Sequence, residues 1–247
     1  MKHPSPFRLA AGFAAAAGLA LVLSACSGGS GAAGKSAERA EGGTEQAGEE
    51  ASAPADDALK QLDEDELATV LNELTYDGKS FATIDVEPPA VQSAIEQFEQ
   101  ADVEPAACQD VLIELVTKPS ADAPNKSALS DDNGYTAAIA SYETNNDAAA
   151  ALQNMIDTSS TCKNMTMTVA GERIEMEMSV DVVDIPGADQ AIETVTTSPM
   201  APGTQQHTVS AVVKNGLVTG SAQHDSTTEK SVGITTELVS AYDKATS

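Results

Sequence analysis

Residues 207–224 read HTVSAVVKNGLVTGSAQH, and this stretch decides the fold. Two runs, 207–213 and 217–223, alternate apolar with small polar residues on either side of Asn215-Gly216. Asn-Gly favours a two-residue type I′ turn, because both central positions of that turn need a positive φ angle. Alternation with a period of two gives each strand one apolar and one polar face. The stretch therefore predicts an antiparallel hairpin whose apolar face must be covered.

The two faces of this hairpin predict different surroundings. The apolar face carries Val209, Ala211, Val213, Val218 and Ala222. The other face carries four hydroxyl side chains and is called the hydroxyl face: Thr208, Ser210, Thr219 and Ser221. Downstream, Ser226-Thr-Thr-Glu229 matches a capping box and begins a helix with an apolar stripe that includes Leu238, Val239 and Tyr242. This closing helix is the simplest cover for the apolar face, and the hydroxyl face then looks outward.

The rest of the chain supplies further helices and strands of the same domain. Periodicity and turn residues predict three helices: one over 59–74 capped by Asp56 or Asp57, one over 88–100, and one from Asn146 and Asp147 to about Ser160. They also predict strands over 110–116, 135–142, 164–170 and 173–183. A polar loop is expected over 117–134, and a Pro/Gly-rich segment with at most two helical turns over 186–203. Hairpins dominate this order. We therefore expect an α+β fold, with a mainly antiparallel sheet and helices packed on one or both of its faces.

Residues 1–57 carry signals for export and tethering. Lys2 and Arg8 precede an uncharged apolar run of 15 residues over 9–23. This run is shorter than the roughly 20 residues that span a membrane. The run ends in Leu23-Ser24-Ala25-Cys26, which resembles the bacterial lipobox, the motif whose cysteine receives diacylglycerol. We expect a lipoprotein signal peptide over 1–25, a lipidated Cys26, a flexible acidic linker over 26–57 and one domain over 58–247. The alternative is an ordinary signal peptide with a chance cysteine.

The acidity of the chain excludes nucleic acid as a partner. The chain has 13 Lys and Arg against 38 Asp and Glu. Residues 1–25 hold two of the basic residues and none of the acidic ones, so the remainder has 11 against 38 and a net charge of −27. Such a surface repels DNA, RNA and anionic lipid headgroups. The expected partners are the membrane, through the lipid anchor, and an unidentified small ligand or another envelope protein.

Two cysteines remain after Cys26, and we expect them to pair. Outside the cytoplasm, two lone thiols most often form a disulfide bond. A bond between Cys108 and Cys162 would close a loop of 55 residues, worth about 4 kcal/mol in the chain-entropy model. The alternative is two buried free thiols.

Two sets of side chains raise the question of a metal site. If Lys214 pairs with Leu217 across the turn, His207 and His224 lie directly opposite each other. They would make half a metal site or a pH-responsive pair, but zinc needs a third ligand that the sequence does not show. We favour two half-exposed imidazoles at the rim of the core. Four methionines alternate so that their sulfur atoms share one face of a strand pair: Met165, Met167, Met176 and Met178. Thioethers suit Cu(I), but core packing is the favoured interpretation, and no cofactor is predicted.

The sequence predicts no catalytic machinery. Ser160-Thr-Cys-Lys163 matches the letters S-x-x-K, but companion motifs such as K-T-G are absent. The chain also has no G-x-S-x-G, no H-E-x-x-H and no phosphate-binding glycine loop. We expect a protein that is not an enzyme.

A ligand cleft is predicted on the hydroxyl face. Small hydroxyl side chains leave room for a ligand and offer both donors and acceptors. The loop over 117–134 is long enough to lean over them, and long loops in compact domains often carry function. The cleft would be formed by Thr208, Ser210, Thr219 and Ser221, with Tyr135 and Tyr142 as walls. The alternative is a plain solvated sheet face.

Several stretches together resemble a known family. They are the opening helix with Leu62, Leu67 and Leu71, Pro105-x2-Cys108 before a strand, the run from Tyr135 to Cys162, and the final hairpin and helix over 207–245. Their order is similar to that of the PknH-type extracellular sensor domain of actinobacterial serine/threonine kinases, which also occurs alone on lipoproteins. The resemblance covers roughly residues 58–247, although family members commonly carry a second cysteine pair that this chain lacks.

This resemblance implies an extracytoplasmic sensing or ligand-binding module with a cleft, and neither catalysis nor a kinase. We therefore expect a lipoprotein anchored at the outer face of the cell membrane. The alternative is a structural or interaction lipoprotein of the cell envelope without a small ligand.

Overall fold

The computed structural model describes residues 59–84, 96, 99–110, 123–169, 171–197 and 205–247. These residues form one ten-stranded sheet in which every neighbouring pair of strands is antiparallel. From edge to edge the strands are β1 (Thr75–Tyr76), β2 (Lys79–Ile84), β4 (Asn125–Ser130), β5 (Tyr135–Ser141), β10 (Gly216–Ala222), β9 (Gln205–Val213), β8 (Gln190–Thr197), β7 (Glu172–Val182), β6 (Asn164–Val169) and β3 (Asp102–Glu104). The predicted α+β fold is confirmed.

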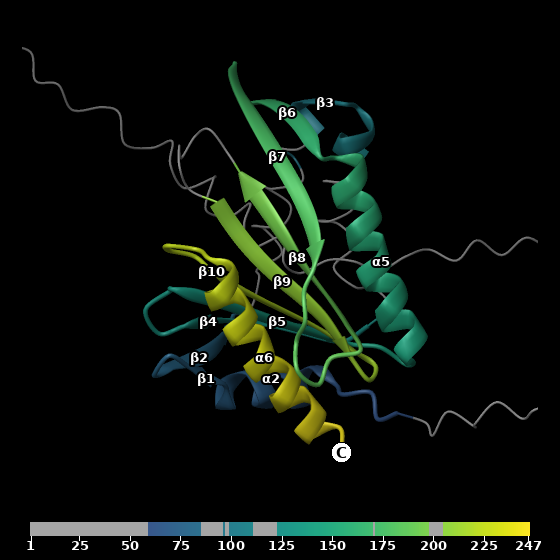
Figure 1. Ribbon diagram of the computed structural model, residues 1–247, viewed down its shortest axis with the longest axis vertical. Helices are drawn as coiled ribbons and strands as arrows, with labels where there is room; N and C mark the ends of the chain where they lie inside the picture. Colours follow the sequence, from purple (N-terminus) through teal and green to yellow (C-terminus); the bar gives the residue numbers. More distant parts are fainter. Residues whose placement is uncertain (1–58, 85–95, 97–98, 111–122, 170, 198–204) are drawn as a thin grey trace, which may run out of the picture.

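Helices cover both faces of this twisted sheet (Figure 1). The helices α2 (Glu64–Glu73) and α6 (Thr228–Ala245) pack on one face, and α5 (Asn145–Thr161) packs on the other. Each face therefore has its own core. The larger core joins α2 and α6 to β5, β9 and β10, and the smaller core joins α5 to the ends of the same strands.

The closing helix covers the apolar face of the final hairpin, as predicted. Ile234, Leu238 and Tyr242 of α6 are completely buried against the sheet. Val209, Ala211, Val213, Val218 and Ala222 face them from β9 and β10. The helix lies so close that a Cβ atom on Gly220 would come within 2.7 Å of Ile234 Cγ2. Glycine at this position is therefore a packing requirement.

The hairpin turn differs from the prediction by one residue. Val213 pairs with Gly216, so Lys214 and Asn215 form the turn, and Lys214 takes the positive φ of 52°. Asn215 is completely buried, and its side chain donates to the carbonyl of Tyr142 at 2.6 Å. The ring of Tyr242 occupies the space that a side chain on Gly216 would need. These tertiary contacts override the local preference of Asn-Gly for the two central positions.

Three helix caps lie at other residues than predicted. Asp63, not Asp56 or Asp57, caps α2 and forms a capping box with Glu66. Thr144 caps α5 and Thr227 caps α6, in place of Asn146 and Ser226. All three caps have extended backbone and accept a hydrogen bond from the N–H three residues later, which is the geometry that selects a cap.

Five strands were not predicted: β1, β2, β3, β4 and β8. The pair β1 and β2 is joined by Asp77 and Gly78, both at positive φ, as an Asp-Gly hairpin turn requires. The loop predicted over 117–134 contains β4, which pairs with β2 and β5. The segment predicted as irregular over 186–203 contains β8, between β7 and β9. Each of these strands is stabilised by its neighbours rather than by a strong local pattern.

The predicted disulfide bond is present. Cys108 lies in a short helical turn over 107–110, and Cys162 caps the end of α5. Their sulfur atoms are bonded, with the Cα atoms 5.6 Å apart. The bond ties the end of α5 to the segment that follows β3. The predictions for 1–57 and for most of the helix over 88–100 lie outside the described residues. Of the strand predicted over 110–116, residue 110 is helical instead, and 111–116 lie outside the described residues.

Candidate ligand-binding site

The hydroxyl face is closed in this structure. Thr219 pairs with Ser210 and Ser221 pairs with Thr208, so the four residues share one face as predicted. However, Ser210, Thr219 and Ser221 are only 1%, 4% and 1% exposed. The prediction that this face looks outward is therefore wrong.

The buried hydroxyl groups bond to one another in pairs. Ser210 Oγ lies 3.0 Å from Thr219 Oγ1, and Ser221 Oγ lies 2.6 Å from Thr136 Oγ1 on β5. Gln223 donates to both Ser221 and Thr136. Buried polar groups are stable only with such partners. The hydroxyl groups of three neighbouring strands are thus hydrogen-bonded to one another and to Gln223. Their role in binding a ligand stays a prediction.

The two tyrosines predicted as walls lie on opposite faces of the sheet. Tyr142 belongs to the α5 side and packs in the smaller core. Tyr135 belongs to the α6 side, where its ring meets Tyr76 edge to face at 5.0 Å and its hydroxyl donates to Asp77. Burial and this hydrogen bond raise the pKa of the Tyr135 phenol. The two side chains therefore cannot border one cleft, and the predicted arrangement is wrong on this point.

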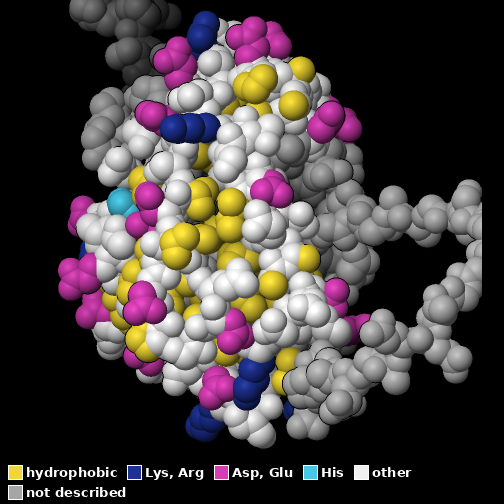
Figure 2. Space-filling view, turned by 45° about the vertical axis from the view of Figure 1, so that its right-hand side comes forward, with side chains coloured by type: hydrophobic (Ala, Val, Ile, Leu, Met, Phe, Trp, Pro, Cys, Tyr) yellow, Lys and Arg dark blue, Asp and Glu magenta, His cyan; other side chains and the backbone are white. Residues whose placement is uncertain are grey.

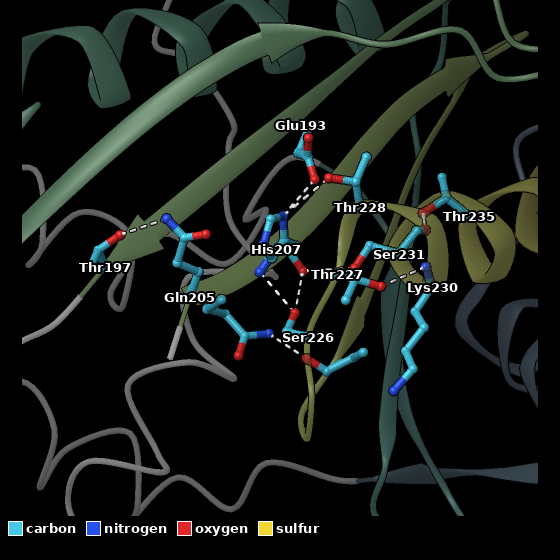
Figure 3. Close-up of polar contacts among 12 residues, drawn as sticks. Glu193, Thr197, Gln205, His207, Ser226, Thr227, Thr228, Lys230, Ser231 and Thr235 are labelled. Carbon is cyan, nitrogen blue, oxygen red and sulfur yellow. Dashed lines mark hydrogen bonds and ion pairs between the residues drawn. The ribbon is translucent and has the colours of Figure 1, made fainter. Parts of the chain in front are cut away.

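The two histidines are not opposite each other. The shifted turn moves the pairing by two residues, which keeps the faces but separates this pair. His224 is exposed beyond the end of β10. His207 instead contacts Glu193 of β8, with His207 Nδ1 2.8 Å from Glu193 Oε1 (Figure 3).

His207 connects the beginning of α6 to β9 through hydrogen bonds of its side chain and backbone. Its Nδ1 also lies 3.3 Å from Thr228 Oγ1 in the first turn of α6. Its backbone N–H donates to Ser226 Oγ, and its carbonyl accepts from Ser231 Oγ (Figure 3). Glu193 is 6% exposed, so its carboxylate depends on this imidazole for a partner. Among the described residues, no group of three His, Cys, Asp or Glu side chains could hold a metal ion.

The four methionines share one buried face, as the alternation predicts. Met165 pairs directly with Met176 across β6 and β7, and Met167 and Met178 lie on the same side. All four are 8% exposed or less. This burial fits the packing interpretation.

An apolar pocket lies where α5 faces the connection between β7 and β8. It has a volume of about 270 Å³. Leu152 and Ile156 line it from α5, and Ile185, Ala188 and Ile192 line it from the connection and β8. Figure 2 shows hydrophobic side chains gathered over the middle of this side of the molecule. The pocket is concave and mostly apolar, as small-ligand sites usually are.

The rim of this pocket carries both an apolar side chain and carboxylates. Val182, at the end of β7, is 87% exposed, and it is the exposed large apolar residue of the described chain. Asp184 and Asp189 also line the pocket. Asp189 Oδ2 accepts from Asn145 Nδ2 at 2.9 Å and from the Lys214 N–H at 3.2 Å, which fixes the connection against α5 and the hairpin turn.

The sequence does not predict this site, because the site depends on β8. The sequence predicts an irregular segment over 186–203, and without a strand there it does not predict that Ala191 and Ile192 lie near α5. One signal was present: Val182 and Val183 are adjacent apolar residues that break the alternation of β7. Such a break often marks the point where a strand leaves the sheet.

Within the described residues, no helix is long and apolar enough to cross a membrane. The sequence matches no protein-family model and no curated protein.

Two solved structures are similar to this chain. One is an uncharacterized protein from Mycobacterium smegmatis, with 12% sequence identity and a TM-score of 0.33, covering 66% of this chain and 85% of its own. The other is the extracellular domain of PknH from Mycobacterium tuberculosis, with 18% identity and a TM-score of 0.47, covering 74% of this chain and 93% of its own. The second structure is of the type that the sequence resembles.

Proposed function

We propose that this chain is a lipoprotein, held at the outer face of the cell membrane through Cys26, whose domain binds an apolar group without chemical turnover. The observation that carries the binding role is the 270 Å³ pocket between α5 and the β7–β8 connection. The anchoring role rests on Leu23-Ser24-Ala25-Cys26 and the apolar run before it.

The shape and lining of the pocket support binding rather than catalysis. Its described lining is mostly aliphatic, and the polar side chains in it are Asp184, Asp189 and Gln190. Aliphatic walls stabilise a ligand by removing apolar surface from water, at about 25 cal/mol per Å². The volume is just below the range of about 300–1,000 Å³ that is typical of drug-sized ligands, so it suits a small apolar group.

Three isoleucines make this proposal testable. Ile156, Ile185 and Ile192 line the pocket, while Ile139 and Ile234 are buried elsewhere in the larger core. In the exported chain carrying Cys26→Ala, which needs no detergent, the isoleucine δ1 methyls can be labelled with ¹³C. Nile red, a neutral apolar probe, should shift the three pocket methyls and leave Ile139 and Ile234 in place.

Two variants act as controls. Ala188→Phe should fill the pocket and weaken Nile red binding at least tenfold, by the argument that a filled cavity leaves no room for a ligand. Val182→Ser changes an exposed side chain and should keep the fold while weakening binding less. If Nile red leaves all three pocket methyls unshifted, the binding role is wrong and a structural lipoprotein of the envelope takes its place.

A further inference from the structure

We propose that the pocket receives a cationic peptide segment, in which an apolar side chain enters the pocket and neighbouring Lys or Arg side chains meet the carboxylates at its rim. This inference rests on the proposed binding function and names its partner. Three features carry it: the charge of the described pocket rim, the exposure of Val182, and the net charge of the whole sequence.

The rim offers negative charge that the protein does not neutralise. Of the described residues that line the pocket, two are Asp and none is Lys or Arg. Asp184 is exposed and has no hydrogen bond or ion pair within the described chain. Lys214, whose backbone bonds to Asp189, directs its ammonium group away to Asp243, 2.8 Å distant. A positive group beside the pocket would therefore meet a carboxylate that no described Lys or Arg neutralises.

Exposed apolar surface extends beyond the pocket itself. Val182 is 87% exposed at the pocket rim, between Asp181 and the half-buried Val183. A small molecule that fills about 270 Å³ would leave Val182 in water. A peptide could place one side chain in the pocket and lay the next across Val182, which would bury both surfaces. This geometry favours a peptide over a compact ligand.

The net charge of the whole molecule favours a positively charged partner. The chain carries a net charge of −25, and acidic side chains border the apolar area in Figure 2. This field attracts cationic ligands and repels fatty acids and anionic lipid headgroups, most strongly at low ionic strength. An apolar pocket in an acidic surface therefore favours a peptide in which an apolar residue is flanked by Lys or Arg.

Three capped six-residue peptides test this partner. The first has two central leucines flanked by lysines, the second has glutamates in place of the lysines, and the third has serines in place of the leucines. With the ¹³C-labelled Cys26→Ala chain at low salt, the first peptide should shift Ile156, Ile185 and Ile192. It should bind about tenfold or more tightly than either of the others.

Matched charge variants locate the contact. Asp184→Asn should weaken binding of the lysine–leucine peptide about two- to fivefold and reduce its salt dependence, as expected for a rim ion pair. Glu237→Gln removes the same charge from an exposed position on α6 outside the pocket lining and should leave binding unchanged.

The outcomes separate the two proposals. If the leucine peptides with lysine and with glutamate bind equally well, the cationic partner is wrong while the apolar site stands. If the serine peptide binds as well as the leucine peptide, only surface charge is involved and the inference also fails. If Nile red shifts the pocket methyls but no peptide does, the partner is not a peptide. If Nile red does not shift them, the proposed function itself is overturned, and this inference falls with it.

Discussion

At the scale of single residues, Tyr242 is the point at which distant parts of the chain meet. Its side chain is completely buried, and its hydroxyl lies 2.7 Å from Ser141 Oγ and donates to Asn215 Oδ1 at 3.1 Å. Ser141 Oγ in turn accepts from the Leu62 N–H. One phenol therefore joins the start of the domain, the end of β5, the hairpin turn and the closing helix.

Burial gives this phenol a distinct titration. Loss of solvation raises the pKa of Tyr242 to about 12, from an ordinary value of 10.0. The folded state thus prefers the protonated form more than the unfolded state does. The resulting stabilisation is complete below pH 10 and is lost as the pH rises through the folded pKa of about 12.

Tyr242→Phe tests this residue. Absorbance at about 295 nm should detect one additional tyrosine in the wild-type chain, which ionises near pH 12 and which the variant lacks. This ionisation should occur before global unfolding. At neutral pH the variant should lose about 1–3 kcal/mol of unfolding free energy, because Ser141 and Asn215 each lose a buried partner. An additional wild-type tyrosine that ionises near the ordinary value of 10.0, together with unchanged stability of the variant, would contradict the buried network.

At the scale of elements, α6 and β10 are in close contact in the larger core. A Cβ atom on Gly220 would lie 2.7 Å from both Ile234 Cγ2 and Thr235 Oγ1. Gly220→Ala should therefore lower the unfolding free energy by about 1–3 kcal/mol, the usual effect of overpacking. Urea denaturation measures this change.

Gly134→Ala is the matched control for this substitution. There the added Cβ would meet only the carboxylate of Asp132, at 2.9 Å, which lies on an exposed loop and is held by Ser130, Lys79 and the Gly134 N–H rather than by core packing. The control should lose clearly less stability than Gly220→Ala. Equal losses in the two variants would mean that α6 and β10 can move apart at little cost.

The elements also show how far the sequence predicts this fold. The final hairpin and α6 were predictable because their apolar residues recur with a clear period and local signals mark their ends. The strands β4 and β8 were not, since Asn125–Ser130 is rich in small and polar residues and β8 lies in a Pro/Gly-rich setting. Pairing on both sides stabilises these strands, and pairing is a property of the assembled sheet.

The candidate site was less predictable than the fold for the same reason. The sequence correctly placed the four hydroxyl residues on one face, but it could not show that Thr136 and Gln223 would occupy their hydrogen-bonding groups. The pocket depends on Ile192 of β8 lying near Ile156 of α5, residues that are far apart in the chain. Such a juxtaposition follows from topology rather than from any motif.

At the scale of the whole molecule, the disulfide bond links the end of α5 covalently to the segment that follows β3. Removing a native disulfide typically costs about 2–5 kcal/mol. Cys162→Ser should lower the unfolding free energy within this range, measured by urea denaturation under oxidising conditions. Under reducing conditions the wild-type chain should approach the stability of the variant. A wild-type stability that is insensitive to reductant would contradict a structural role for the bond.

Anchoring is tested on the whole molecule in its own membrane. Cys26→Ala should move the protein from the membrane fraction to the soluble extracytoplasmic fraction, because the diacylglyceryl group has no attachment site. Cys162→Ser is the control, since it removes a different cysteine and should leave the protein with the membrane. Sedimentation of the Cys26→Ala chain with membranes after a high-salt wash would place the anchor elsewhere.

The hairpin turn at Lys214 and Asn215 holds both ends of the domain. Asn215 Nδ2 lies 3.4 Å from the carbonyl of Lys60, and Lys214 Nζ lies 3.1 Å from Ser247 Oγ. Residues 60 and 247 therefore both lie near this turn, so an engineered linker can join them. We expect a circular permutant joined there and reopened between Asp131 and Asp132 to keep the strand pairings of the sheet while beginning the chain just before β5. Folding of this permutant would show that the sheet forms independently of the order in which its strands are synthesised.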